Sequence, residues 1–218
     1  MKRTLLGVML FAAWANAQAQ DAAFALLGRF GTLGLGLEVG RGISDKWAVR
    51  AGLNGYSTER SVTESNVRYD AEIDLRSAGV TFDWHPAAGA FRLSAGAFYN
   101  GTEFSVLGRA TGGTFEFNGT TYSASEIASL SGKVTFKKFA PFIGVGFGNV
   151  TKRGFSYSVD LGALYQRAPD VELNVSCGVT AQCSQLTSDV QAEQAQLRSD
   201  IKGYRFWPVI QAGFGYVF

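Results

Sequence analysis

The strongest constraint on this chain is an alternation of apolar residues with polar residues or glycine, sustained over long runs. Between Phe91 and Ala97 every second residue is apolar, and arginine, serine and glycine occupy the positions between. Residues 155–165 and 210–218 largely repeat the pattern. A period of two is the signature of a β-strand with two different faces. Soluble strands average about 5–6 residues, whereas these runs extend over about 9–20, and about 9–11 tilted residues cross a bilayer. The pattern therefore predicts membrane-spanning strands.

The number of runs and their connections predict a closed barrel. Seven runs are evident, at 32–41, 47–58, 68–85, 91–108, 131–148, 154–175 and 203–218. An even number is expected, so we infer an eighth strand over Ala22–Phe30, with Phe24, Leu26 and Phe30 facing lipid. Connections at 40–46, 85–90 and 148–153 are short, whereas those at 58–67, 109–130 and 176–202 are long and polar. Short periplasmic turns and long extracellular loops are typical of outer-membrane barrels. We predict an all-β fold, an eight-stranded antiparallel transmembrane β-barrel forming one domain over 20–218.

Two of the predicted strands change phase. In 68–85 the apolar row that begins at Tyr69 occupies odd positions, but the row from Ala78 occupies even ones. The strand 131–148 slips in the same way between Phe136 and Phe139. A one-residue β-bulge would keep both rows on one face. We predict one bulge near 76–77 and another between 136 and 139.

The first 19 residues resemble a secretory signal peptide. Lys2 and Arg3 precede an apolar stretch of about ten residues and small residues suited to cleavage after Ala17 or Ala19. Because the leader carries two basic residues and no acid, the 20 basic residues of the chain fall to 18, equal to the 18 acidic ones. A neutral mature chain gives no reason to expect a nucleic-acid partner. We expect a monomer in the lipid of the Gram-negative outer membrane.

Aromatic residues gather at the predicted strand ends, as in the interfacial girdles of membrane barrels. Trp47 and Trp84 lie on the side of the short turns. The chain ends with Phe214, Tyr216 and Phe218, which resembles the terminal signal of substrates of the barrel-assembly machinery. We expect that machinery to be a partner.

The last long loop has two features of its own. Cys177 and Cys183 are close in sequence, and an oxidising envelope favours a small disulfide between them. Leu186 and Val190 begin a helical spacing of apolar residues within 184–202, which predicts a short amphipathic helix. Such a helix either caps the barrel mouth or connects two strands, and we favour the connection.

Charged residues on the lumenal faces are the candidate functional site. These residues are Arg29, Glu38, Arg50, Asp83, Arg92 and Asp160. Buried charges must pair or stay hydrated, so they form either an ion-pair plug or a selectivity lining for small zwitterions. Many other lumenal positions are glycine, which either relieves crowding in a narrow barrel or leaves a water path.

Catalysis has little support in the sequence. The single histidine, His85, precedes Pro86 in a predicted periplasmic turn and has no evident nucleophile beside it. Asp70, Glu72 and Asp74 form an acidic group that we place at the extracellular rim, on the lumenal side of one strand. Without a partner base we expect no enzyme activity, and we expect no cofactor and no bound metal.

Several segments carry a family resemblance. They are residues 69–75, 91–100, 140–148, 161–173 and 203–209. In this order they resemble the small outer-membrane channels of the CarO type, which are linked to uptake of ornithine and other basic amino acids. The resemblance implies eight strands and a passive role without a cofactor.

These observations lead to three functional hypotheses. The first is a narrow passive channel for small polar solutes, with basic amino acids as the solutes that the resemblance suggests. The second is a plugged barrel without transport that acts through its loops in envelope integrity or surface contact. A hydrolase at the rim is the least favoured.

Overall fold

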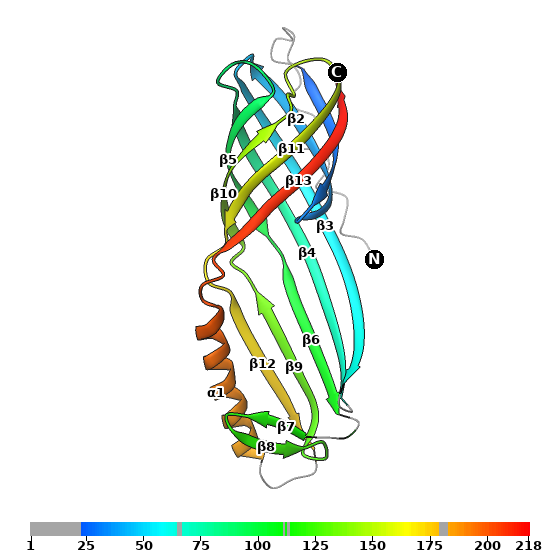
Figure 1. Cartoon of the computed structure of the whole chain (residues 1–218), viewed down its shortest axis with the longest axis vertical. Coiled ribbons are helices and arrows are strands. Elements are labelled where there is room, and N and C mark those ends of the chain that lie inside the picture. Colours follow the sequence, from blue (N-terminus) through cyan, green and yellow to red (C-terminus); the bar gives the residue numbers. More distant parts are fainter. Residues whose placement is uncertain (1–22, 65–66, 111, 113, 179–182) are drawn as a thin grey trace, which may run out of the picture.

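The computed structural model describes residues 23–64, 67–110, 112, 114–178 and 183–218 (Figure 1). The predicted leader, residues 1–19, lies outside the described residues. Among the helices of the described chain, none is long and apolar enough to cross a membrane.

Eight strands close into an antiparallel ring, as predicted. Their order around the ring is β1 (Phe24–Gly31), β2 (Gly34–Ser44), β3 (Trp47–Glu64), β4 (Val67–Trp84), β5 (Phe91–Asn100), β10 (Phe139–Phe147), β11 (Gly154–Tyr165) and β13 (Phe206–Val217), and β13 pairs with β1. Closure leaves the ring without an open edge, which a sheet surrounded by lipid requires. The chain therefore has the predicted barrel, and both described ends lie near the short turns (Figure 1).

The outer surface of the ring is an apolar belt. On β1 the side chains of Phe24, Leu26 and Phe30 are exposed, whereas Arg29 between them is buried. The same alternation exposes Leu35 and Leu37 on β2, and the other ring strands follow it. Apolar side chains outside and charged ones inside are the arrangement that lipid stabilises.

Beyond the ring, the same sheet continues into an extension that the sequence did not predict. β3 and β4 run on past the barrel, and β6 (Glu103–Ala110), β9 (Ile127–Thr135) and β12 (Asp170–Cys177) join them in the order β12-β9-β6-β4-β3. We call these five strands the outer sheet. The predicted strands 91–108, 131–148 and 154–175 are therefore each two strands.

The breaks within these strands have a local cause. The backbone N–H of Gly101 donates to the carbonyl of Arg76 at 2.7 Å, and that of Asn100 donates to Lys138 at 2.7 Å. The side chain of Asn100 accepts from the N–H of Thr102 at 3.1 Å. These bonds satisfy the backbone while the chain exchanges partners in the ring for partners in the outer sheet.

The predicted bulge near 76–77 is wrong. β4 pairs with β3 in a single register from Trp84 opposite Trp47 to Val67 opposite Glu64. The odd positions of β4 therefore face inward throughout, which buries Asp83 in the barrel and packs Tyr69 inside the outer sheet. Within the barrel, the inner face of β4 meets a polar lumen, so its apolar side chains point outward. In the outer sheet the same face meets a hydrophobic core, so its apolar side chains point inward.

The second predicted bulge, between 136 and 139, is wrong for the same reason. Leu130 packs inside the outer sheet, and Ala140 and Phe142 lie inside the barrel, all at even positions. The chain leaves regular pairing at 136–138 and resumes it with the same side inward.

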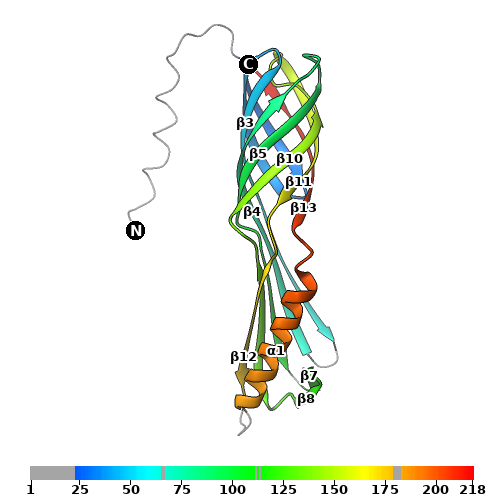
Figure 2. The same cartoon turned by 90° about the vertical axis from the view of Figure 1, so that its left-hand side faces the viewer.

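The helix α1 (Cys183–Ile201) covers the outer sheet, alongside which it runs in Figure 2. Its Leu186 and Val190 are buried with Tyr122 and Ile127, near the small hairpin of β7 (Thr114–Phe117) and β8 (Thr120–Ser123). The helix was predicted over 184–202, and it does more than connect two strands, because its Leu186 and Val190 belong to a hydrophobic core.

Side chains of α1 also complete the free edge of β12. The N–H of Leu173 donates to Gln194 Oε1 at 2.6 Å, and Arg198 Nε donates to the carbonyl of Val171 at 2.9 Å. Arg198 also pairs with Asp170 at 2.9 Å. These bonds occupy backbone groups that an unpaired strand edge would otherwise offer to another chain.

Candidate functional site

The six charged residues predicted for the lumen meet in one cluster. They come from six strands of the ring: Arg29 from β1, Glu38 from β2, Arg50 from β3, Asp83 from β4, Arg92 from β5 and Asp160 from β11. All are buried except Glu38, whose side chain is 12% exposed. We call this cluster the lumenal network.

Asp160 is the centre of the lumenal network. Its carboxylate accepts hydrogen bonds from Arg29 Nη2, from Arg92 Nη2 at 2.7 Å and from Arg50 Nη2 at 3.3 Å. One carboxylate thus joins three arginines from three strands.

The other two acids complete the pairing. Glu38 accepts from Arg50 Nη1 at 3.0 Å and from Arg29 Nη1 at 3.2 Å. Asp83 accepts from Arg50 Nε, and from Ser94 at 2.6 Å. Three cations and three anions make the network formally neutral, which is the condition under which buried charges are tolerated.

An apolar layer lies in the lumen toward the outer sheet. Phe98 and Phe142 are buried with Leu33 and Leu164, and the two phenyl rings contact edge to face with centroids 5.6 Å apart. Ala140 and Val209 complete this group, which we call the aromatic layer. Bulky rings fill the narrow lumen of an eight-stranded barrel.

Lumenal glycines make room for these rings. A Cβ on Gly144 would approach the ring of Phe142 to 2.7 Å, and one on Gly162 would approach it to 2.6 Å. A Cβ on Gly79 would overlap the ring of Phe98. Of the two readings of the glycines, the structure favours relief of crowding over a water path.

The opposite end of the lumen is filled as well. Ala25, Leu27, Ala48, Val150 and Val217 are buried together near the periplasmic turns. Between this group and the aromatic layer, the space beside the lumenal network is about 10 Å³, room for at most about one water molecule. Buried side chains thus occupy the lumen at three successive levels: the periplasmic group, the lumenal network and the aromatic layer.

The acidic group does not face the lumenal side of its strand, as was predicted. Asp70, Glu72 and Asp74 lie on β4 beyond the ring, but on its outward face, opposite Tyr69. The single register of β4 is the reason, since the expected bulge would have turned them inward. Hydrogen bonds from Ser61, at 2.6 Å, and from Arg68, at 3.1 Å, lower the pKa of Asp70.

His85 directly follows the end of β4 that is remote from these acids. Its Nδ1 lies 2.9 Å from the carbonyl of Gly89 in the periplasmic turn. Among the described residues, no group of three or more histidine, cysteine or acidic side chains converges as metal ligands would.

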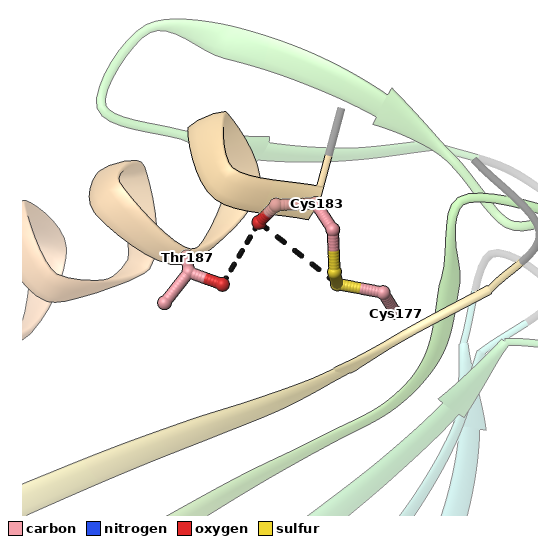
Figure 3. Close-up of a disulfide and its surroundings, with 3 residues drawn as sticks. All are labelled: Cys177, Cys183 and Thr187. Atoms are coloured by element: carbon pink, nitrogen blue, oxygen red, sulfur yellow. Dashed lines mark hydrogen bonds between the residues drawn. A yellow bond between two sulfur atoms is a disulfide. The ribbon is translucent and has the colours of Figure 1, made fainter. Parts of the chain in front are cut away.

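Cys177 and Cys183 form a disulfide between the end of β12 and the start of α1, with Cα atoms 5.9 Å apart (Figure 3). Thr187 donates to the carbonyl of Cys183 at 2.8 Å in the first turn of the helix.

A buried acid joins the helix to the β7–β8 hairpin. Asp189 of α1 accepts from Tyr122 at 2.5 Å, from Asn118 at 3.2 Å and from Gln185 at 3.2 Å. These bonds lower the pKa of Asp189, and the bond to Asp189 raises the pKa of Tyr122 to about 12. We call this group the hairpin clasp.

The terminal aromatics lie on the apolar belt. Phe214 and Tyr216 of β13 are exposed on the outer face, and Phe218 follows directly after the strand. The structure thus positions them where the lipid would be, while their part in assembly stays a prediction.

Phe98 and Phe142 are the site residues that the sequence reasoning missed. A signal for them exists, because each is a large apolar residue at a position where the alternation requires a lumenal residue. Their neighbours of the same parity, such as Arg92 and Gly144, were correctly placed in the lumen.

Comparisons with known proteins agree with this fold. No family model and no curated protein matches the chain. Among solved structures, Acinetobacter baumannii CarO2 is 20% identical with a TM-score of 0.60, covering 90% of this chain and 98% of its own. Acinetobacter baumannii CarO is 23% identical with a TM-score of 0.58, covering 91% of this chain and 97% of its own. The predicted CarO-type resemblance is thus confirmed for the fold.

The closed ring, the apolar belt and the shared fold together identify an outer-membrane β-barrel. They place the lumenal network within the membrane and the outer sheet on the side of the long loops.

Proposed function

We propose that this protein is a sealed outer-membrane barrel that acts through its outer sheet, helix and hairpin rather than by transport. The observation that carries the proposal is the filled lumen, in which the aromatic layer and the neutral lumenal network follow one another. A residual space of about 10 Å³ supports it, since an amino acid is many times larger.

The shape of the outer part supports the same proposal. The outer sheet has its own hydrophobic core with α1, and the disulfide and hairpin clasp hold its far end together. A loop region that only joined strands would not need a core of this kind. We propose surface contact or envelope integrity as the role, with no catalytic activity.

A passive channel is the second candidate, because the lumen carries charges rather than only apolar side chains. In that case a zwitterion such as a basic amino acid would exchange partners with Asp160 and the arginines around it. Passage would require Phe98 and Phe142 to leave their places beside the lumenal glycines.

Liposome swelling separates these two functions. Liposomes with the purified protein are diluted into arginine, ornithine, glutamate or glucose, and empty liposomes and a general porin are the controls. The proposal predicts swelling at the rate of empty liposomes for all four solutes. Faster swelling in arginine and ornithine alone would establish the channel for basic amino acids, and equal fast swelling in all four would establish an unselective pore.

The remaining features of the mature protein belong to the proposal. We propose cleavage after Ala17 or Ala19, which leaves one barrel domain over 20–218, and assembly as a monomer by the barrel-assembly machinery. The apolar side chains of Phe214 and Tyr216 on the last strand support that route. No nucleic-acid partner is proposed.

A further inference from the structure

An apolar window opens in the wall where the outer sheet departs from the ring. It has a volume of about 350 Å³, and its lining includes Phe104, Phe136 and Trp207 together with Pro169, Ile201 and Phe206. The rings of Phe104, Phe136 and Trp207 contact one another, with centroids 5.9 to 6.4 Å apart. We call this opening the window.

The topology explains why a window occurs there. β11 pairs with β13 as far as Tyr165 opposite Phe206, and one further bond joins the N–H of Gln166 to the carbonyl of Arg205 at 2.9 Å. Beyond this point β12 continues into the outer sheet, while the chain before β13 comes from the end of α1. The two segments separate, and side chains alone line the space between them.

The window lies at the level of the outer membrane interface. Tyr165 and Phe206 are exposed and have ring centroids 5.2 Å apart, and Tyr204 is 71% exposed beside them. Exposed tyrosines at strand ends mark the boundary between the hydrocarbon region and the headgroups. A hydrocarbon chain from the outer leaflet can therefore reach the window directly.

Basic residues follow or adjoin lining residues of the window in sequence, on three chain segments. Lys137 and Lys138 lie between β9 and β10, Arg167 lies between β11 and β12, and Lys202 and Arg205 lie between α1 and β13. All five are exposed, and in the described part of the chain none of them is ion-paired with a carboxylate. We call these five residues the basic collar.

The acids of the neighbourhood do not neutralise the basic collar. Asp170 is paired with Arg198 at 2.9 Å. Asp200 and Glu172 are the remaining nearby acids in sequence, so the five cations outnumber the two other acids. Lysine and arginine side chains in excess at a lipid interface bind phosphate groups.

We propose that the window and the basic collar together bind a phosphorylated glycolipid of the outer leaflet. One acyl chain occupies the window against Phe104, Phe136 and Trp207, and the phosphate groups lie on Arg167, Lys202 and Arg205. The indole Nε1 of Trp207 is buried without a hydrogen-bond partner among the described residues, so an acceptor near the first carbons of the acyl chain would satisfy it.

Fluorescence of Trp207 tests the apolar half of the proposal. The chain has four tryptophans, and cleavage of the leader removes Trp14, so the mature variant W47F/W84F retains Trp207 alone. This variant is placed in neutral phosphatidylcholine nanodiscs and titrated with bisphosphorylated lipid A that carries brominated acyl chains. The proposal predicts saturable quenching, and quenching no greater than that by brominated phosphatidylcholine at the same mole fraction would overturn it.

Charge variants test the polar half. In the same background, R167A/K202A/R205A is expected to weaken lipid A binding about tenfold, and dephosphorylated lipid A is expected to bind the unchanged collar about tenfold more weakly. The matched control R41A/K46A/K152A removes three exposed cations near the periplasmic turns and is expected to change binding less than twofold.

Three further outcomes would contradict the proposed lipid site. Equal binding of the phosphorylated and dephosphorylated lipids would overturn the phosphate contact. An equal loss in the collar variant and in the control variant would reduce the effect to general charge and would also overturn the proposal. Competition by inorganic phosphate alone, without any effect of the acyl chains, would identify a phosphate site and contradict a lipid site.

Discussion

Replacement of Asp160 by alanine tests most sharply whether the lumenal network is dry. In the wild type this carboxylate contacts Arg29, Arg50 and Arg92. Its removal leaves three buried arginines facing Glu38 and Asp83, which is one uncompensated positive charge. Removing one partner from a buried ion pair costs about 3–5 kcal/mol, and we expect a loss of stability in that range. In a water-filled lumen the same charges would be screened, and the loss would be at most about 1 kcal/mol.

The assay is urea unfolding of the protein refolded into lipid vesicles, followed by tryptophan fluorescence and far-ultraviolet circular dichroism. The matched control is Asp45→Ala, which removes an exposed acid from the β2–β3 turn and is expected to change stability by less than about 0.5 kcal/mol. The double variant D160A/R92A restores neutrality, with Arg29 and Arg50 opposite Glu38 and Asp83.

The double variant measures the coupling between Asp160 and Arg92. In a dry network Asp160 and Arg92 are coupled, so the double variant should be more stable than the sum of the two single losses predicts, by about 1–3 kcal/mol. Strict additivity, together with a D160A loss no larger than that of D45A, would show that these charges are hydrated. The reasoning for a sealed lumen would then fail.

Three further predictions concern packing, the disulfide and pH. Gly79→Ala should destabilise the barrel by about 1–3 kcal/mol because its methyl group overlaps the ring of Phe98; Phe98→Leu in the same chain should recover part of that loss in urea unfolding, and an unchanged loss would contradict the packing. Cys183→Ser should weaken the start of α1 by about 2 kcal/mol, the loop entropy of a short disulfide, seen as faster hydrogen exchange in the first turns of the helix but not in the barrel. The bond between Tyr122 and Asp189 should contribute its full stabilisation between about pH 4 and 10. The contribution is lost at low pH, as the pH falls from the usual Asp pKa of 3.8 through the lowered pKa of Asp189. It is lost at high pH, as the pH rises from 10 through the raised Tyr122 pKa of about 12. Tyrosinate absorbance with Tyr122→Phe as the control measures the second limb, and a Tyr122 that titrates near 10 would contradict the clasp.

The sequence predicted the membrane part of the fold because lipid imposes a simple rule. Every second residue must be apolar where a strand crosses the bilayer, and this rule placed the lumenal residues of β1, β5 and β11 correctly. Even the least regular strand, β1, followed it, with Arg29 inside between the exposed Leu26 and Phe30. Closure into a ring then brought together charges from distant parts of the chain.

The same rule led to the prediction of two bulges that the structure does not contain. Alternation distinguishes the two faces of a strand, but it does not show which face points to the interior. In the part of β4 before Leu75, the apolar residues lie on the inward face, because α1 and the hairpin provide a hydrophobic core there in place of lipid. The local sequence of β4 does not show that this core exists, because the residues that pack on Tyr69, from Phe115 onward, lie more than 40 positions later in the chain. The acids Asp70 and Asp74 were assigned to the wrong face for this reason alone.

The seal of the lumen could be predicted in part. The six charges of the lumenal network were identified, but the choice between a plug and a selectivity lining depends on distances that a sequence does not contain. Phe98 and Phe142 broke the alternation visibly. A large apolar residue at a lumenal position of a narrow barrel predicts a constriction, and this is the inference that was available from the sequence.

Planar-bilayer conductance of the purified protein shows whether the lumen is sealed. A sealed wild-type barrel gives no current steps above the baseline of the lipid in symmetrical salt, with a general porin incorporated under the same conditions as the positive control. Reproducible conductance steps from wild-type protein, which disappear when the protein is unfolded, would contradict a lumen closed by Phe98, Phe142 and the lumenal network.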